Sequence, residues 1–308
     1  MRILVTGGTG FIGSSIIVSN ILPGNIFYPS HEELDLLDLA QVKAYIKKNK
    51  IKYVIHTAVF SALLTNREEG LEHDMQMFTN IIHCSNLLNK IIYFGSGAEF
   101  DKARDLKKIN EEQWGESLPT DNYGRAKYLM HKIGKDNPKV ANLRLFGVFG
   151  QNEDYRFKFI TNTIAKHVLR FPININQDVI FDYLDIRDLA PIVKYFLENR
   201  SNHSSYNITP TQSIKLSGIL KIIDKIGKRK SKCQILNSGF NYQYTGSNER
   251  LLQEIPDLVF IPIEESISNL YQWFSDNALS LDREALMQDE FIRHTQIKNE
   301  TGLHSDVY

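Results

Sequence analysis

Residues 5–13, VTGGTGFIG, decide the fold of this chain. They follow the aliphatic run RILV and precede a segment with helical apolar spacing, so the glycines lie in a turn between a strand and a helix. Gly7 permits a turn that a side chain would block. Gly10 lets the backbone approach a pyrophosphate, and Gly13 lets the helix pack on the strand. The stretch therefore predicts the first βαβ unit of a dinucleotide-binding fold.

The start of this helix is the expected phosphate contact. Phe11 and Ile12 are its first residues, and their N–H groups have no partner within the helix. Such N–H groups and the positive end of the helix dipole bind phosphate oxygens. We therefore expect a nicotinamide dinucleotide cofactor at this end of the chain.

Outward from this turn, short β-branched or aliphatic runs alternate with longer helical patterns, which is typical of a parallel sheet with helices on both faces. Strands are predicted at RILVT (2–6), NIFY (25–28), YVIHT (53–57), IIYFGS (91–96) and VANLRLF (140–146). Helices are predicted at 12–22, 39–49, 69–89, 123–135, 156–170, 188–199, 216–227 and 264–275. The fold class is α/β, a Rossmann-type doubly wound sheet with a smaller C-terminal α/β lobe.

Three regions are expected along the 308 residues. Residues 1–150 form the cofactor-binding domain. Residues 151–281 form mostly a substrate-binding lobe, with some segments that return to the first sheet. Residues 282–308 form a polar C-terminal tail with little periodicity, for which we expect poor order.

Composition excludes several classes of partner. The chain has 36 basic and 36 acidic residues, so no overall field favours nucleic acid or an anionic membrane. Cys84 and Cys233 are the only cysteines, and they form neither a metal-ligand cluster nor a disulfide framework. No run approaches the roughly 20 apolar residues that span a bilayer, and the N-terminus lacks a signal-peptide pattern. We expect a soluble, cytoplasmic protein without a metal.

The second predicted strand bears on the choice of cofactor. NAD-specific sites usually carry an acidic residue at its end, whereas a 2′-phosphate needs cationic or polar donors. Here Ser30 and His31 stand at that place, which favours NADP over NAD, although His31 can equally be read as a solvated loop residue. Asp35, with Leu36, is a candidate to meet the adenine, and a helix cap is the alternative for Asp35.

A candidate catalytic pair lies in DNYGRAKYLMHK (121–132). Tyr123 and Lys127 are one helical turn apart and share a face. A phenol has a pKa near 10, and a nearby ammonium lowers that pKa, so the pair can transfer a proton. Tyr128 and Lys132 repeat the spacing, but Tyr123 follows a cap region and lies in the first turn. We prefer a packing role or a subunit contact for Tyr128.

These features together resemble the extended short-chain dehydrogenase/reductases, which modify nucleotide-linked sugars. The resemblance spans roughly residues 1–275. It rests on GGTGFIG, a serine after the fourth strand, YGRAK, VIHTA (54–58), LRLFGVFG (143–150), DYLDIRDLA (182–190) and YNIT (206–209).

The resemblance implies roles for individual residues. Ser96 would hydrogen-bond the substrate oxygen, Tyr123 would transfer the proton, and Lys127 would hold the nicotinamide ribose and tune the tyrosine. Thr57 and Ala58 would line the cofactor. The alternative for Ser96 is a cap at the end of its strand.

The neighbours of Ser96 narrow the reaction. Related 4,6-dehydratases carry an Asp-Glu pair directly after the catalytic residue, where this chain has Gly97 and Ala98. Neither can move a proton, and strand alternation should turn Glu99 to the other side. The chain looks most like the GDP-fucose synthase and dTDP-4-dehydrorhamnose reductase branch. GDP-fucose synthase also epimerises its substrate, with a cysteine at the place of Ala98 and a histidine near the place of Lys158. Both residues are absent here, so ketoreduction without epimerisation is the reaction that the residues can support.

Departures from the family affect the expected substrate contacts. Many sugar-nucleotide relatives have Asn in place of Gly147 and Arg in place of Phe181, and both contact substrate there. Asp74 also replaces a usual asparagine. The substrate diphosphate must then find other donors. The candidates are Arg156, Lys158 and Arg187, each equally explained as a solvated surface charge.

Three functions follow as hypotheses. The leading one is an NADP(H)-dependent reductase of a nucleotide-diphospho-4-keto-6-deoxyhexose, which serves deoxysugar supply for a surface polysaccharide such as O-antigen. The second is a nucleotide-sugar C4 epimerase with tightly bound NAD. The third is a non-catalytic NAD(P) sensor, against which the retained Ser96, Tyr123 and Lys127 count. By resemblance, the helix at 69–89 and the helix that carries Tyr128 would form a homodimer interface, and packing on the sheet explains their apolar stripes equally well.

Overall fold

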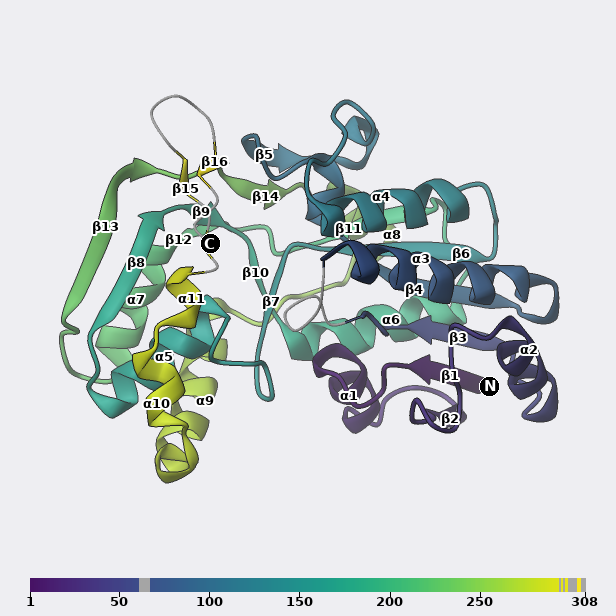
Figure 1. Cartoon of the computed structure of the whole chain (residues 1–308), viewed down its shortest axis with the longest axis horizontal. Coiled ribbons are helices and arrows are strands. Elements are labelled where there is room, and N and C mark those ends of the chain that lie inside the picture. Colours follow the sequence, from purple (N-terminus) through teal and green to yellow (C-terminus); the bar gives the residue numbers. More distant parts are fainter. Residues whose placement is uncertain (61–66, 294, 296, 299–303, 306–308) are drawn as a thin grey trace.

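A six-stranded parallel sheet forms the larger lobe. We describe a computed structural model for residues 1–60, 67–293, 295, 297–298 and 304–305. The strand order is β2-β1-β3-β4-β6-β11 (Figure 1), and every pair is parallel. The strands are β1 (Arg2–Thr6), β2 (Asn25–Phe27), β3 (Tyr53–His56), β4 (Lys90–Ser96), β6 (Val140–Leu145) and β11 (Ser205–Ile208). The predicted parallel sheet is confirmed, and its sixth strand, β11, comes from the second half of the chain.

Helices cover both faces of this sheet, so the doubly wound fold is confirmed. Successive strand residues point to opposite faces. Ile3 and Val5 pack with α1 and α6, whereas Leu4 and Val54 pack with α2, α3 and α4. The helices are α1 (Phe11–Val18), α2 (Leu39–Lys48), α3 (Arg67–His83), α4 (Asn122–Gly134) and α6 (Leu189–Glu198).

Three predicted helices are shorter than the sequence pattern suggests. α1 ends at Val18 rather than residue 22. α3 ends at His83 rather than near residue 89, because the chain turns through a 3-10 helix, η1 (Ser85–Leu87), and enters β4. α5 begins at Phe159 rather than residue 156. There Asp154 accepts hydrogen bonds from the backbone and the side chain of Arg156 and holds the preceding residues in a turn.

The smaller lobe packs helices against short sheets, around a core that includes Phe149, Ile164 and Phe274. Its helices are α5 (Phe159–Leu169), α7 (Leu216–Ile226) and α9 (Ile263–Asp276), whereas α8 (Glu249–Glu254) lies in the larger lobe, where Leu251 joins the core beside β11. Its two-stranded pairs are β10 (Tyr183–Asp185) with β7 (Gly147–Phe149), and β13 (Cys233–Phe240) with β8 (Ile173–Asp178). A four-stranded sheet consists of β12 (Ile214–Lys215), β9 (Ile180–Phe181), β14 (Tyr244–Gly246) and β5 (Leu106–Ile109).

The described part of the C-terminal tail forms short elements that pack on the smaller lobe. It forms α10 (Arg283–Met287), α11 (Glu290–Arg293) and a small hairpin of β15 (Ile297–Lys298) and β16 (His304–Ser305). Leu286 is fully buried, and Asp289 pairs with Lys166 of α5 and accepts a hydrogen bond from Asn174 of β8. These contacts compensate for the weak periodicity of the segment. The other residues of the predicted tail lie outside the described ones.

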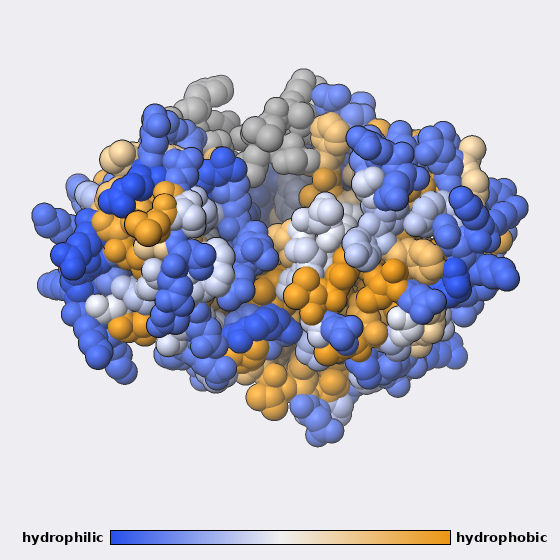
Figure 2. All heavy atoms as spheres, turned by 90° about the horizontal axis from the view of Figure 1, so that it is seen from below, coloured by the Kyte–Doolittle hydropathy of each residue, from blue (hydrophilic) through white to orange (hydrophobic). Residues whose placement is uncertain are grey.

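The carboxyl ends of the parallel strands face the smaller lobe (Figure 1), and the surface is hollowed between the two lobes when seen from below (Figure 2). The chain runs from β1 out to β2 and returns to β3 on the other side, so the strand order reverses between β1 and β3. Open α/β sheets bind ligands at such a reversal, outside the carboxyl ends. None of the described helices is long and apolar enough to cross a membrane.

Candidate active site

The glycine turn after β1 is shaped for a close ligand. Gly7 has φ +67°, which side-chain-bearing residues rarely adopt, and a Cβ there would lie 2.7 Å from the backbone nitrogen of Ala58. A Cβ at Gly13 would collide with the carbonyl oxygen of Gly7 and lie 2.8 Å from Thr57 Oγ1. Thr57 Oγ1 donates to the carbonyl oxygen of Thr6 at 2.6 Å. The structure thus brings the glycine turn together with Thr57 and Ala58.

The N-terminus of α1 leaves its first N–H groups open to a ligand. Its N-cap, Gly10, has no side chain that could accept from the first turn, and its own N–H donates to Gly7 O at 3.0 Å. The N–H groups of Phe11 and Ile12 can therefore reach phosphate oxygens. This cradle, which a Cβ would fill, fits a dinucleotide pyrophosphate.

The loop after β2 is an exposed turn. Ser30 and His31 are both exposed, and the N–H of Ser30 donates to Glu33 Oε2 at 2.8 Å. Glu33, for which the sequence predicted no role, is the carboxylate that this turn engages. Asp35 Oδ1 accepts from Leu37 N at 2.9 Å, and the side chain of Leu36 is buried in the core. Leu36 can thus offer a cofactor only its backbone.

Ser96 ends β4 and caps the short 3-10 helix that follows, η2 (Gly97–Phe100). Its Oγ accepts from Ala98 N at 3.2 Å, and its N–H donates to Glu99 Oε1 at 3.1 Å. Both readings of Ser96, a cap and a site residue, are therefore compatible. Glu99 turns away from the site, as expected. The cause is the capping box of η2 and not the alternation of side chains along a strand.

A buried polar network lies behind Ser96. Glu99 and Arg144 form an ion pair, Nε to Oε2 at 2.9 Å, and both side chains are 0% exposed. Asn142 Nδ2 donates to Glu99 Oε1 at 3.1 Å, and Arg144 Nη1 donates to Asn207 of β11 at 3.3 Å. The network ties η2 to β6 and β11, so the position of Ser96 depends on strands distant in sequence.

α4 carries the tyrosine and the lysine to the same place. Asp121 caps the helix by accepting from Gly124 N at 2.9 Å. A Cβ on Gly124 would lie 2.7 Å from the carbonyl oxygen of Ala98, so the first turn of α4 lies directly against η2. Tyr123, in that first turn, is thereby next to the residues that follow Ser96.

Lys127 and Tyr123 share a face, as their spacing predicts. Lys127 Nζ lies 5.8 Å from the centroid of the Tyr123 ring and donates to Phe94 O at 3.0 Å. Lys127 is 4% exposed. Tyr128 instead stacks on Trp114, with ring centroids 4.5 Å apart and planes 16° from parallel. The second Tyr-Lys pair thus packs away from the site.

The expected lowering of the tyrosine pKa is not what the protein produces. The pKa of Tyr123 is raised to about 12, first by burial of the hydroxyl end and further by the carboxylates of Asp74, Glu99 and Asp121, although a hydrogen bond from Ser96 opposes the shift. Tyr123 as a whole remains 45% exposed. Tyr123 is therefore a protonated phenol at neutral pH, the form that donates a proton.

Burial, opposed by two carboxylates, lowers the pKa of Lys127. The carboxylates are those of Asp74 and Glu99. His56, at the end of β3, is fully buried from solvent, and its pKa is lowered to about 3 by burial and by the charge of Lys127. His56 is thus neutral, and Asp74, which accepts from the N–H of Phe60, is the nearby anion. The sequence analysis noted Asp74 only as a departure.

An aromatic cluster, missed by the sequence analysis, adjoins Ser96. We define it as Phe146, Phe181, Tyr183 and Tyr244. Phe181 stacks on Tyr183 at 4.9 Å and on Tyr244 at 4.8 Å between centroids, and Phe146 lies 5.1 Å from Tyr244. The four residues come from three separate segments of the chain, so no local pattern reveals the cluster.

Gly147 makes room for this cluster, which leads to a stability prediction. A Cβ on Gly147 would lie 2.5 Å from Asp182 O and 2.9 Å from the rings of Phe181 and Tyr183. Gly147→Asn, the residue common in relatives, is therefore expected to lose about 1–3 kcal/mol of unfolding free energy in urea titrations. Gly218→Ala, in α7, is the control and should be neutral or stabilising. An equal loss in both variants would contradict the steric account.

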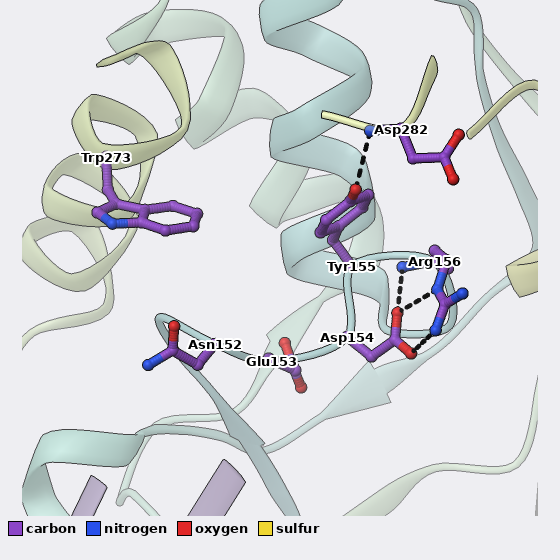
Figure 3. A pocket seen from close by; sticks show the side chains of 7 residues that line it. All are labelled: Asn152, Glu153, Asp154, Tyr155, Arg156, Trp273 and Asp282. Atoms are coloured by element: carbon purple, nitrogen blue, oxygen red, sulfur yellow. Dashed lines mark hydrogen bonds and ion pairs between the residues drawn. The ribbon is translucent and has the colours of Figure 1, made fainter. Parts of the chain in front are cut away.

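Of the three candidate substrate cations, two are held by neighbouring carboxylates. Arg187 binds Asp185 through Nε at 3.0 Å and Nη2 at 2.6 Å. Arg156 likewise binds Asp154 through Nε and Nη2. Arg156 also lines a hollow of about 400 Å³, which lies between the loop that precedes α5, the helix α9 and the start of α10 (Figure 3). Neither Ser96, Tyr123 nor Lys127 lines that hollow. Lys158 is the exposed N-cap of α5.

Glu153 in the same hollow gives a pH-dependent prediction. Burial raises its pKa from 4.5 to about 8, although Lys158 and a hydrogen bond from Thr161 oppose the shift. Between those pH values the folded state holds a proton that the unfolded state has lost, so stability falls as the pH rises. Glu153→Gln should exceed wild type by roughly 4 kcal/mol at pH 8 and converge with it towards pH 4.5. Urea unfolding at both pH values tests this, and a pH-independent difference would contradict it.

No group of three or more His, Cys, Asp or Glu side chains in the described part of the chain could hold a metal ion. The chain is 24% identical over 307 residues to a GDP-L-fucose synthase of Dictyostelium discoideum, covering 89% of this chain and 95% of that protein. It is 21% identical over 266 residues to an ADP-L-glycero-D-manno-heptose-6-epimerase of Brachyspira hyodysenteriae, covering 74% and 82% respectively.

Among solved structures, a GDP-L-fucose synthetase from Naegleria fowleri bound to NADP has a TM-score of 0.79 at 19% identity, covering 92% of this chain and 95% of that one. This likeness supports the fold. The model of the family described as "NAD dependent epimerase/dehydratase family" matches residues 3–209. The match spans more than half of the 308 residues and confirms the resemblance seen in the sequence. The chain therefore belongs to the NAD-dependent epimerase/dehydratase family.

Proposed function

We propose that this protein is an NADP(H)-dependent reductase of a nucleotide-diphospho-4-keto-6-deoxyhexose. The observation that carries the proposal is the junction of η2 and α4, where Ser96 and a protonated Tyr123 lie together with Lys127 beneath the tyrosine ring. A 4-ketone that accepts hydride also needs one proton on its oxygen. A phenol with a raised pKa holds that proton until negative charge develops on the substrate.

Each residue has one role in this reaction. The nicotinamide, when bound, supplies the hydride. Ser96 donates a hydrogen bond to the carbonyl oxygen, and Tyr123 delivers the proton to the same oxygen. Lys127 stabilises the phenolate that remains and holds the nicotinamide ribose. Gly97 and Ala98, next to Ser96, carry no acid or base, so the site supports reduction rather than dehydration.

We propose NADP rather than NAD as the cofactor because of the residues in the exposed turn after β2. Ser30 and His31 offer a hydroxyl and an imidazole to a 2′-phosphate, and the carboxylate of Glu33 is already engaged by the N–H of Ser30. The NADP-bound Naegleria structure is in keeping with this choice. Titration of the protein with NADPH and NADH tests it, and tighter binding of NADH would overturn it.

The smaller lobe is proposed to bind the nucleotide diphosphate, with Lys158, the exposed N-cap of α5, as the candidate cation. We also propose a cytoplasmic homodimer that serves surface polysaccharide synthesis. Leu129 and Ile133 on α4 are 37% and 42% exposed, which leaves apolar side chains for a second copy to cover. Sedimentation equilibrium tests the dimer, and a monomer at micromolar concentration would contradict it.

The deciding experiment follows nicotinamide absorbance while the protein, with NADPH or NADH, meets a panel of nucleotide-linked 4-keto-6-deoxy sugars. Oxidation of NADPH by wild type but not by Tyr123→Phe is the expected result. No oxidation with any sugar, together with NAD released on denaturation, would instead favour a C4 epimerase.

A further inference from the structure

The hydroxyl of Tyr244 lies against Ser96. The distance from Tyr244 OH to Ser96 Oγ is 3.4 Å, across 148 residues of sequence. Tyr244 belongs to β14, which the pairing with β5 and β9 holds in the four-stranded sheet. Its side chain is 8% exposed, so water does not compete freely for this hydroxyl.

Packing fixes the direction of the Tyr244 hydroxyl. Its ring lies between Phe181 and Phe146 of the aromatic cluster. A Cβ on Gly97 would approach Tyr244 OH to 2.6 Å, and a Cβ on Gly246 would approach the Phe146 ring to 2.5 Å. The two glycines thus leave just enough space for the rings, and the hydroxyl of Tyr244 stays on Ser96.

The hydrogen-bond capacity of Ser96 gives this contact a direction. A serine hydroxyl has one donor and two acceptor lone pairs. The N–H of Ala98 takes one lone pair at 3.2 Å. If Tyr244 donates to the second lone pair, the single Ser96 proton remains on the side of Tyr123, where it can turn from the phenol to the substrate oxygen. If Ser96 donated to Tyr244 instead, it would have no proton left for a carbonyl oxygen.

We propose that Tyr244 is a positioning residue that donates its hydroxyl proton to Ser96 Oγ and thereby aims the Ser96 O–H at the carbonyl oxygen of the sugar substrate. The inference rests on the proposed ketoreduction. It forms a chain of hydrogen bonds, Tyr244 to Ser96 to substrate, in which each donor strengthens the next. Burial raises the pKa of Tyr244 well above its ordinary value, so its proton stays in place throughout the pH range of activity.

The two tyrosines that border Ser96 therefore have different tasks. Tyr123 is partly exposed and gives its proton to the substrate, whereas Tyr244 is buried and keeps its own. Removal of the Tyr244 hydroxyl leaves the Ser96 proton free to rotate, but it leaves Ser96, Tyr123 and Lys127 all present. The expected defect is thus in kcat, with a smaller effect on KM.

A double-mutant cycle tests this role with four proteins: wild type, Tyr244→Phe, Ser96→Ala and the double variant. Tyr244→Phe should lower kcat about tenfold and change KM less than about twofold, as expected for one hydrogen bond. In the Ser96→Ala background the same change should lower kcat less than about twofold, because the group through which Tyr244 acts is gone. An equal loss in both backgrounds, or no loss in wild type, would overturn the proposal.

Controls separate this inference from the proposed function and from folding. Tyr128→Phe removes a tyrosine hydroxyl outside the site and should leave kcat unchanged. Thermal unfolding shows whether each variant is folded, and Tyr244→Met serves as a second hydroxyl-free variant if the phenylalanine variant does not fold. A wild type that reduces no keto sugar would overturn the proposed function itself. An active wild type with additive losses would overturn only the role of Tyr244.

Discussion

Tyr123→Phe is expected to lower kcat by roughly 10²–10⁴-fold, the range that one proton-transferring side chain contributes. Tyr123 lies on the first turn of α4 against η2 and is 45% exposed, whereas Tyr244, the other phenol beside Ser96, is buried, and Gly97 and Ala98 carry no proton to give. Its pKa of about 12 keeps it protonated at every pH at which the protein would be assayed. The rate should therefore not rise as the pH falls from 8 to 6 through titration of this group.

The measurement is single-turnover oxidation of NADPH with the sugar that wild type reduces. NADPH affinity should change little, because the cradle at Gly7 and Gly13 and the amino group of Lys127 remain. Retention of more than about a tenth of the wild-type rate would show that another group supplies the proton. Loss of NADPH binding along with the rate would show that Tyr123 acts on the cofactor instead.

Glu99→Gln is expected to have the largest effect on stability, a loss of about 3–5 kcal/mol of unfolding free energy. The substitution keeps the size of the side chain but removes the charge that faces Arg144, and both residues are 0% exposed. The guanidinium would then be a buried cation without a counter-ion. Asn142 and the N–H of Ser96 also donate to this carboxylate, so the amide would weaken three further hydrogen bonds.

Urea unfolding at pH 7 measures this loss. Glu198→Gln is the matched control, because Glu198 pairs with Lys194 at 2.8 Å with side chains 35% and 42% exposed. Such an exposed pair contributes about 0.5 kcal/mol or less. A similar small loss for both variants would mean that water reaches the Glu99–Arg144 pair. A lower kcat in the surviving folded Glu99→Gln protein is also expected, since η2 orients Ser96.

The parallel sheet could be predicted because its signals are local. Glycines between β1 and α1 must form a turn, and the alternation of aliphatic runs with helical patterns leaves a parallel sheet as the simplest arrangement. The shared face of Tyr123 and Lys127 is equally local, because one helical turn fixes it. Helix ends were less predictable. α5, for example, begins only at Phe159 because Asp154 holds the preceding residues in a turn.

The pKa of Tyr123 illustrates what spacing cannot give. The sequence placed one ammonium near the phenol and so predicted a lower pKa. The fold brings three carboxylates from separate segments within reach and buries the hydroxyl, and the sum of these effects raises the pKa. Desolvation depends on every atom around a group, which no pair of residues in the sequence reveals.

By itself the sequence determined the glycine cradle, the parallel sheet and the Tyr-Lys face, because each depends on backbone conformation within a few residues. Only the tertiary structure decided what surrounds Ser96: the hydroxyl of Tyr244 on one side and the Glu99–Arg144 ion pair behind it. These partners lie 148 and 45 residues apart in sequence. Tyr244 and Arg144 reach this place because neighbouring strands and apolar cores fix β14 and β6. A hydrogen bond or an ion pair depends on the distance between two groups in the folded protein and not on their separation along the chain.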